Sequence, residues 1–95
     1  MEYIGNFKIT GYDICMKCCG KLDGITASGA IATVGRTIAT DKQFPFGTKI
    51  YIDGLGTYVV EDRGGAIKNN KIDVFVANHT DAYAITGQYD CYIVQ

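Results

Sequence analysis

Short runs of alternating apolar and polar positions recur along the chain, and glycines separate most of them. In KIDVFV, residues 71–76, the side chains of Ile72, Val74 and Val76 share one face because side chains alternate along a strand. The runs rich in Val, Ile, Thr and Tyr are 6–12, 36–40, 48–53, 57–62, 71–76 and 88–94. Six strands in so short a chain favour closure into a barrel.

One helix is predicted at residues 79–86, between the last two runs. Asn78 can cap its first turn, Asp81 suits the positive end of the helix dipole, and Gly87 can end it. Ala82 and Ile85 would then face the core. The pattern predicts a mainly β domain with one short helix near the C-terminus.

The length and composition limit what this domain can be. A chain of 95 residues forms one domain, 1–95, because so small a core cannot be divided into two. Nearly half of the residues are apolar and the formal net charge is −1, which excludes a nucleic-acid-binding tail and a disordered acidic segment. We therefore expect a compact domain that has no nucleic-acid partner.

No export signal or membrane span is apparent in the sequence. MEYIGNFKIT lacks a basic segment followed by an apolar one, and nowhere do 18 apolar residues run together. We expect a mature fragment of an exported protein or a phage-type protein, with residues 1–9 partly a leader segment.

The four cysteines allow two interpretations. They are Cys15, Cys18, Cys19 and Cys91. The C-x-x-C spacing with a fourth thiolate on the last strand could bind zinc. Adjacent cysteines are awkward zinc ligands, and small domains outside the cell more often carry disulfides. We therefore favour a disulfide between the loop and Cys91, with no metal, and the sequence does not say which loop cysteine takes part.

Two aspartates interrupt strand runs where an apolar residue or threonine would pair better. Alternation places Asp73 on the outer face of its run, and it groups Tyr58, Val60 and Asp62 on one face. The loop between the runs could bring Asp62 and Asp73 together, and burial beside a second carboxylate would raise the pKa of Asp73 so that it acts as a general acid. The alternative is that both cap turns. Asp41, taken alone, is typical of a turn-opening residue.

Several motifs together resemble the three-aspartate (3D) domain family of cell-wall-active proteins. They are GITASG, ATD, FPFGTKIYI, EDRGGAIK and KIDVF, in a resemblance that runs from Thr10 to the C-terminus. It implies a six-stranded double-psi β-barrel similar to the catalytic domain of membrane-bound lytic transglycosylase A, and a likeness to muralytic proteins of the stationary-phase-survival and resuscitation-factor kind. Related barrels also occur in endoglucanases and expansins, so the fold alone does not fix the activity.

The resemblance implies a lytic transglycosylase, which cuts the bond between N-acetylmuramic acid and N-acetylglucosamine and forms a 1,6-anhydro ring. One carboxyl can suffice, as it first donates a proton and then accepts one. The resemblance assigns that role to Asp73, coupled to Asp62, with Asp41 orienting groups in the groove. The residues expected to contact substrate are Thr26, Gly64, Gly65 and Lys68, and no cofactor is required.

A cell-wall glycan-binding or expansin-like module that does not cut is the alternative function. In either case we expect peptidoglycan glycan strands as the partner, an extracellular or cell-wall location, and a monomer or an element-swapped dimer. Arg63 departs from the small or polar residue expected after the second aspartate of the family. If Arg63 paired with Asp62 or Asp73, it would lower the pKa of that carboxyl and weaken the acid.

Overall fold

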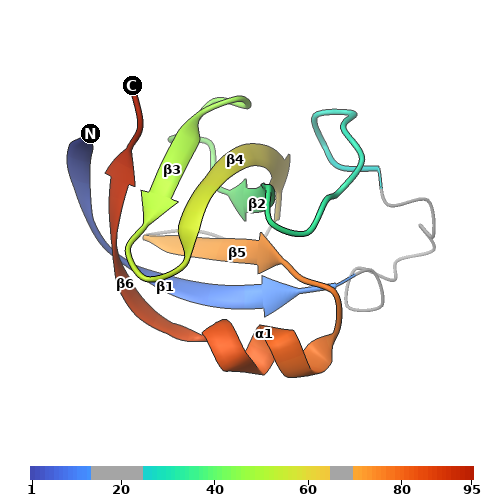
Figure 1. Ribbon diagram of the computed structural model, residues 1–95. Coiled ribbons are helices and arrows are strands. Elements are labelled where there is room, and N and C mark those ends of the chain that lie inside the picture. Colours follow the sequence, from blue (N-terminus) through green and yellow to red (C-terminus); the bar gives the residue numbers. More distant parts are fainter. Residues whose placement is uncertain (14–24, 65–69) are drawn as a thin grey trace.

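A closed barrel of six strands forms the body of the protein (Figure 1). The computed structural model describes residues 1–13, 25–64 and 70–95. The barrel order is β1-β5-β2-β4-β3-β6. The elements are β1 (Glu2–Tyr12), β2 (Thr37–Thr40), β3 (Lys49–Ile52), β4 (Gly56–Arg63), β5 (Lys71–Phe75), α1 (His79–Ile85) and β6 (Gly87–Ile93). The expected six-stranded barrel with one short helix near the C-terminus is confirmed.

The strand pairing joins segments that are far apart in the sequence. β1 pairs in parallel with β5, and β2 pairs in parallel with β4, while the remaining neighbours are antiparallel. β5 therefore lies between β1 and β2, and β2 lies between β5 and β4 (Figure 1). This order places β1, β5 and β2 side by side, although β5 is far from both of the others in the sequence.

The first strand begins earlier than the sequence pattern indicates. It starts at Glu2, which is the register partner of Ile93 on β6. Most of the segment 1–9, expected to be partly a leader, thus belongs to a barrel strand. Within the described part of the chain, no helix has both the length and the apolar character needed to cross a membrane.

Alternating side chains fill the interior of the barrel. The predicted inward residues of β5, Ile72 and Val74, are buried, and so is Val76 just beyond its end. They pack in one cluster with inward side chains of the other strands: Phe7, Ile9, Ile38, Ile50, Ile52 and Val60. The period-two pattern read from the sequence therefore identifies the core correctly.

Cys91 lies in this core, and the predicted disulfide to it is wrong. Its side chain is 0% exposed and carries a free thiol, which donates to the carbonyl oxygen of Tyr89 at 3.6 Å. Burial raises the pKa of the thiol to about 11. Alternation along β6 turns Cys91 inward among apolar side chains. Cys15, Cys18 and Cys19 lie outside the described residues.

The helix forms as its capping residues predict. The side-chain oxygen of Asn78 accepts a hydrogen bond from the backbone N–H of Asp81 at 2.9 Å. Ala82 is buried and Ile85 packs against the core. The helix ends at Ile85, because Thr86 has extended backbone angles and caps it.

Gly11 lets α1 lie directly against β1. A Cβ atom added at Gly11 would be 2.6 Å from the Cα and 2.8 Å from the Cβ of Ala82. The Ala82 backbone cannot give way as the end of a flexible side chain would. The absence of a side chain at Gly11 therefore sets how closely the helix approaches the barrel.

We predict that Gly11→Ala destabilises the domain by about 1–3 kcal/mol, the usual cost of overpacking a tight contact. For a domain of this size, the melting temperature should fall by about 4–8 °C for each kcal/mol. Gly87→Ala is the matched control, since its added Cβ meets only the ring of Tyr89 at an ordinary 3.5 Å. Equal melting temperatures for the two variants in thermal denaturation would contradict the tight packing of α1 on β1.

Candidate active site

Two of the three predicted aspartates lie on either side of one small residue. Ala39 on β2 is the register partner of Asp62 on β4 and of Asp73 on β5. Neighbouring strands lie about 4.8 Å apart, so the two aspartates are two strand spacings apart across the sheet. Asp73 is in turn the register partner of Thr10 on β1. The sheet therefore places Asp62, Ala39, Asp73 and Thr10 in one row across four strands.

Because of a β-bulge in β4, Asp62 does not lie on the face that the sequence predicts for it. Val60 pairs with Ile38 but Asp62 pairs with Ala39, the next residue of β2, so Glu61 is skipped in the register. Val60 packs in the barrel core, whereas Asp62 bonds to Tyr12, which packs with Ala39 in a separate cluster. Val60 and Asp62 do not share a face, because the extra residue interrupts the alternation.

The skipped residue has its own polar contacts, which keep the bulge in place. The Oε1 atom of Glu61 accepts hydrogen bonds from the Oγ1 of Thr37 at 2.7 Å and from the Nε of Arg36 at 3.1 Å. The carbonyl oxygen of Glu61 also accepts from the backbone N–H of Ser28 at 3.1 Å. Side-chain and backbone contacts of Glu61 thus replace the missing ladder pairing.

Asp62 is the buried carboxylate of the pair, with 1% of its surface exposed. Its Oδ1 accepts from the backbone N–H groups of Ala27 and Arg63 at 3.0 and 2.9 Å, and its Oδ2 accepts from the hydroxyl of Tyr12 at 3.1 Å. Donors aimed at a carboxylate stabilise its charged form. This set of contacts therefore favours an ionised Asp62.

Asp73 has a more open environment on the outer face of β5, as the sequence predicts. Its side chain is half-buried, and its Oδ1 accepts a hydrogen bond from the hydroxyl of Thr10 at 3.0 Å. The hydroxyl fixes the orientation of the carboxyl group without adding a charge. Asp73 is thus the less buried of the two carboxylates.

Tyr12 bonds to Asp62 and packs against β5, the strand that carries Asp73. Its ring packs edge-on against Phe75, with ring centroids 5.4 Å apart, and its hydroxyl donates to Asp62. Burial raises the pKa of Tyr12 far above its ordinary value, and the charges of Asp62 and then Asp73 raise it further. The phenol therefore keeps its proton at neutral pH and donates a hydrogen bond to Asp62.

Comparison with known proteins identifies the family. The sequence model of the 3D domain matches residues 36–95, which is more than half of the chain. The chain belongs to the 3D domain family.

The curated relatives of this 3D domain are longer proteins from Bacillus subtilis (strain 168). The "Cell wall-binding protein YocH" is 43% identical over 67 residues, covering 66% of this chain and 23% of the relative. The "Putative cell wall shaping protein YabE" is 38% identical over 69 residues, covering 68% of this chain and 17% of the relative. The chain thus spans less than a quarter of the length of either protein.

The third aspartate of the 3D domain, Asp41, lies in a turn at the end of β2. Its Oδ1 accepts from the backbone N–H of Gln43 at 3.2 Å, and its carbonyl oxygen accepts from the hydroxyl of Thr40 at 2.9 Å. This is the turn-opening arrangement that its local sequence predicts. Thr40 pairs with Arg63, the residue after Asp62, so the turn adjoins the end of β4 that carries Asp62.

Arg63 does not form an ion pair with either central aspartate of the 3D domain. Its Nη2 donates to the carbonyl oxygen of Phe44 at 2.7 Å, and its guanidinium carbon lies 4.2 Å from the ring centre of Phe46. Nη1 donates to the hydroxyl of Thr40 at 3.4 Å. Arg63 therefore holds the FPFG turn, and the ion pair with Asp62 or Asp73 that the sequence left open does not form.

The hydroxyl of Thr26 contacts its own turn. It donates to the carbonyl oxygen of Ala30 at 2.8 Å and lies 3.1 Å from the hydroxyl oxygen of Ser28. The turn that it stabilises positions the Ala27 N–H on Asp62. Of the other residues expected at the substrate, Gly64 follows directly after β4, and Gly65 and Lys68 lie outside the described residues.

Sequence reasoning missed two residues that touch the aspartates, Thr10 and Tyr12. Both lie on β1, and both precede the stretch that matches the family. The signal was available, because alternation in NFKITGY puts Thr10 and Tyr12 on the face opposite to Phe7 and Ile9. What the sequence could not supply was the pairing of β1 with β5.

We predict that Tyr12→Phe changes the alkaline stability of the domain. Below pH 10 the phenol is protonated in both states; above pH 10 only the unfolded chain loses this proton, so stability falls as pH rises, by up to about 1.4 kcal/mol per pH unit. Urea unfolding between pH 7 and pH 11.5 should show that Tyr12→Phe removes this part of the slope.

At pH 7 the same variant should lose about 1–3 kcal/mol, because buried Asp62 loses one donor. Tyr83→Phe is the control, since it removes a hydroxyl from an exposed ring. Parallel stability curves for both variants would show that the Tyr12 phenol is not held by Asp62.

Proposed function

We propose that this 3D domain is a lytic transglycosylase that cleaves peptidoglycan glycan strands, with Asp73 as general acid and then general base. One observation carries the proposal. Asp62 and Asp73 both pair with Ala39 in the sheet. Asp62 is 1% exposed and accepts hydrogen bonds from three donors, while Asp73 is partly exposed. Enzymes give two carboxyl groups different roles by placing them in different environments, so that one stays ionised and the other acts as the acid. A buried carboxylate beside a more exposed one is such an arrangement.

The chemistry requires only one accessible carboxyl. Asp73 donates its proton to the glycosidic oxygen as the bond to C1 of N-acetylmuramic acid breaks, and the leaving sugar keeps that proton. The 6-hydroxyl of the same muramic acid then bonds to C1, and its proton returns to the Asp73 carboxylate. The product is a 1,6-anhydro ring, no water is consumed, and Asp73 regains its starting state.

Asp62 supports this cycle without touching the substrate. Its negative charge opposes ionisation of Asp73, which favours the protonated form needed for the first step. The same charge stabilises the positive charge that develops at C1 in the transition state. Tyr12 holds Asp62 in position, and Thr10 holds Asp73. Asp41, at the end of β2, would orient groups at the edge of the site, and Gly64, Gly65 and Lys68 would lie along the glycan.

The names of the relatives support action at the cell wall. One is called a cell wall-binding protein and the other a putative cell wall shaping protein. We therefore propose peptidoglycan as the partner and the cell wall or extracellular space as the location. The word "binding" in the first name also favours a second candidate, a module that grips glycan without cutting it.

Incubation with purified peptidoglycan followed by mass spectrometry of the soluble products distinguishes these functions. A lytic transglycosylase releases muropeptides that end in anhydromuramic acid, and a hydrolase releases reducing ends. If the protein sediments with peptidoglycan and releases neither product, the binding module is the correct function.

We predict that Asp73→Asn lowers the rate of anhydro-muropeptide release about a hundredfold to ten-thousandfold, the usual loss when a general acid is removed. Asparagine keeps the size of the side chain and can accept the Thr10 hydrogen bond, but it cannot deliver a proton at neutral pH. Melting temperature and sedimentation with peptidoglycan should stay near the parent values. Release at close to the parent rate by a folded Asp73→Asn variant would refute the assignment.

We predict that Asp62→Asn lowers the rate and moves the descending alkaline limb of the pH–rate profile to lower pH. Without the neighbouring negative charge, Asp73 loses its proton more readily, so less of the acid form remains as pH rises. Asp53→Asn is the control, because it removes the same charge from an exposed turn. Melting temperatures verify that each variant folds, and an unshifted profile in Asp62→Asn would mean that the two carboxylates are not coupled.

A further inference from the structure

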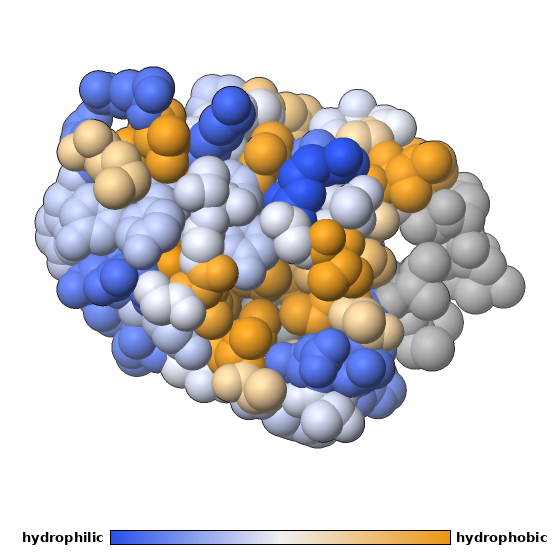
Figure 2. Space-filling model, viewed as in Figure 1, coloured by the Kyte–Doolittle hydropathy of each residue, from blue (hydrophilic) through white to orange (hydrophobic). Residues whose placement is uncertain are grey.

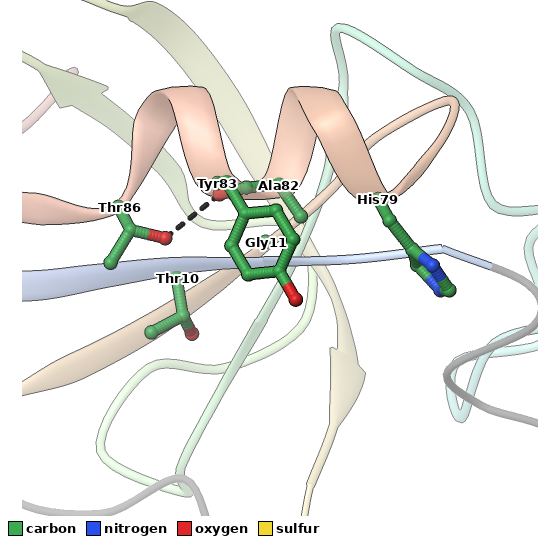
Figure 3. A pocket seen from close by; sticks show the side chains of 6 residues that line it. All are labelled: Thr10, Gly11, His79, Ala82, Tyr83 and Thr86. Atoms are coloured by element: carbon green, nitrogen blue, oxygen red, sulfur yellow. Dashed lines mark hydrogen bonds between the residues drawn. The ribbon is translucent and has the colours of Figure 1, made fainter.

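An open pocket lies between α1 and β1, beside the proposed acid (Figure 3). Its volume is about 410 Å³, and its lining residues are Thr10, Gly11, His79, Ala82, Tyr83 and Thr86. Pockets of several hundred Å³ are the size that proteins use for small ligands or for one part of a larger ligand. None of the catalytic or substrate-binding residues expected from the sequence lines this pocket.

Thr10 links the pocket to the row that contains the two carboxylates. Thr10 lines the pocket, and its hydroxyl donates to Oδ1 of Asp73 at 3.0 Å. Thr10 and Asp73 are register partners on neighbouring strands, about 4.8 Å apart. A chain molecule that occupies the pocket and extends across β1 therefore reaches Asp73 next.

Tyr83 gives the pocket a flat aromatic wall. Its ring is 81% exposed and belongs to neither apolar cluster of the barrel. Figure 3 shows the ring reaching from α1 across β1, in front of Gly11, with Thr10 close by. An exposed tyrosine ring suits a binding site, because it combines an apolar face with a polar hydroxyl at its tip. Tyr83 has no packing role that would explain its place.

The remaining lining suits a ligand that is apolar on one face and polar at its rim. Gly11 and Ala82 are small and apolar, and on the face shown in Figure 2 apolar atoms reach the surface above α1. Polar groups lie at the edges, where the Nε2 atom of His79 is held 3.5 Å from the buried carboxylate of Asp13. A pyranose ring has this character, with C–H bonds on its face and hydroxyl groups around its edge.

We propose that this pocket is a sugar-binding subsite, in which an N-acetylated sugar of the glycan strand stacks on Tyr83 while the neighbouring glycosidic bond lies at Asp73. The inference rests on the proposed action on glycan strands, and it adds the residue that positions the strand. Gly11 and Ala82 line the pocket beside the ring as its apolar part. Tyr83 is a binding residue here, and it takes no part in proton transfer.

The test measures binding separately from cleavage. The probe is a tetrasaccharide of β-1,4-linked N-acetylglucosamine, titrated into ¹⁵N-labelled Asp73→Asn protein so that no cleavage intervenes, with sedimentation on purified glycan strands as a second arm. The amide signals of Gly11, Ala82, Tyr83 and Thr86 should shift. Tyr83→Ala should weaken the affinity about tenfold or more, the loss typical of an aromatic anchor at a binding site.

Two further variants make this result specific. Tyr83→Phe keeps the ring and should bind within about twofold of the parent, because a hydroxyl at the exposed tip adds little. Tyr3→Ala removes another exposed tyrosine, at the opposite end of β1, and should bind like the parent. Each variant carries Asp73→Asn, and melting temperatures verify that each variant folds.

Several outcomes would overturn the subsite. Tyr83→Ala binding as tightly as Tyr3→Ala, or no binding of either probe to the Asp73→Asn protein at millimolar concentration, would refute it. Anhydro-muropeptide release that does not depend on Tyr83 would leave the enzyme proposal standing without the subsite. Tyr83-dependent binding with no release by the parent would support the subsite in a binding module.

Discussion

The candidate site depends on one irregularity in strand pairing, the β-bulge at Glu61. Without it, Asp62 would follow Val60 into the barrel core, where an ionised carboxylate costs far more than any apolar contact returns. The extra residue carries Asp62 to the side of Ala39, and two backbone N–H groups and one phenol satisfy the carboxylate there. Bulges often lie next to active sites because they redirect a side chain without ending the strand.

The contrast between Asp62 and Asp73 follows from that geometry. Two like charges on one face of a sheet oppose each other, so the structure stabilises one and leaves the other accessible. Asp62 accepts hydrogen bonds from two backbone N–H groups and the Tyr12 hydroxyl, and Asp73 accepts one from the hydroxyl of Thr10. The chemistry proposed for Asp73 uses this difference.

β1 has a larger part in the site than the family comparison indicates. The match to the 3D domain covers residues 36–95, yet Thr10 and Tyr12 come from β1, and Gly11 of the same strand sets the position of α1. The pocket at Tyr83 exists where that helix meets that strand. The N-terminal strand therefore closes the barrel, orients both carboxylates and forms one wall of the proposed sugar subsite.

The sequence by itself determined the elements of this fold, because each depends on local rules. Alternation identified the strands and their buried faces, capping by Asn78 identified the helix, and the ordered motifs identified the three aspartates. Local rules could not reveal which strands pair, so they missed Thr10 and Tyr12, misjudged the facing of Asp62, and left Cys91 as a disulfide partner when it is a core residue. Those features are contacts between residues about 25 to 65 positions apart in the chain, which only closure of the barrel brings together. The tertiary structure alone decided that Asp62 is buried while Asp73 is partly exposed, because the hydrogen-bond donors to the two carboxylates come from three separate segments, β1, the turn at Ala27 and the end of β4.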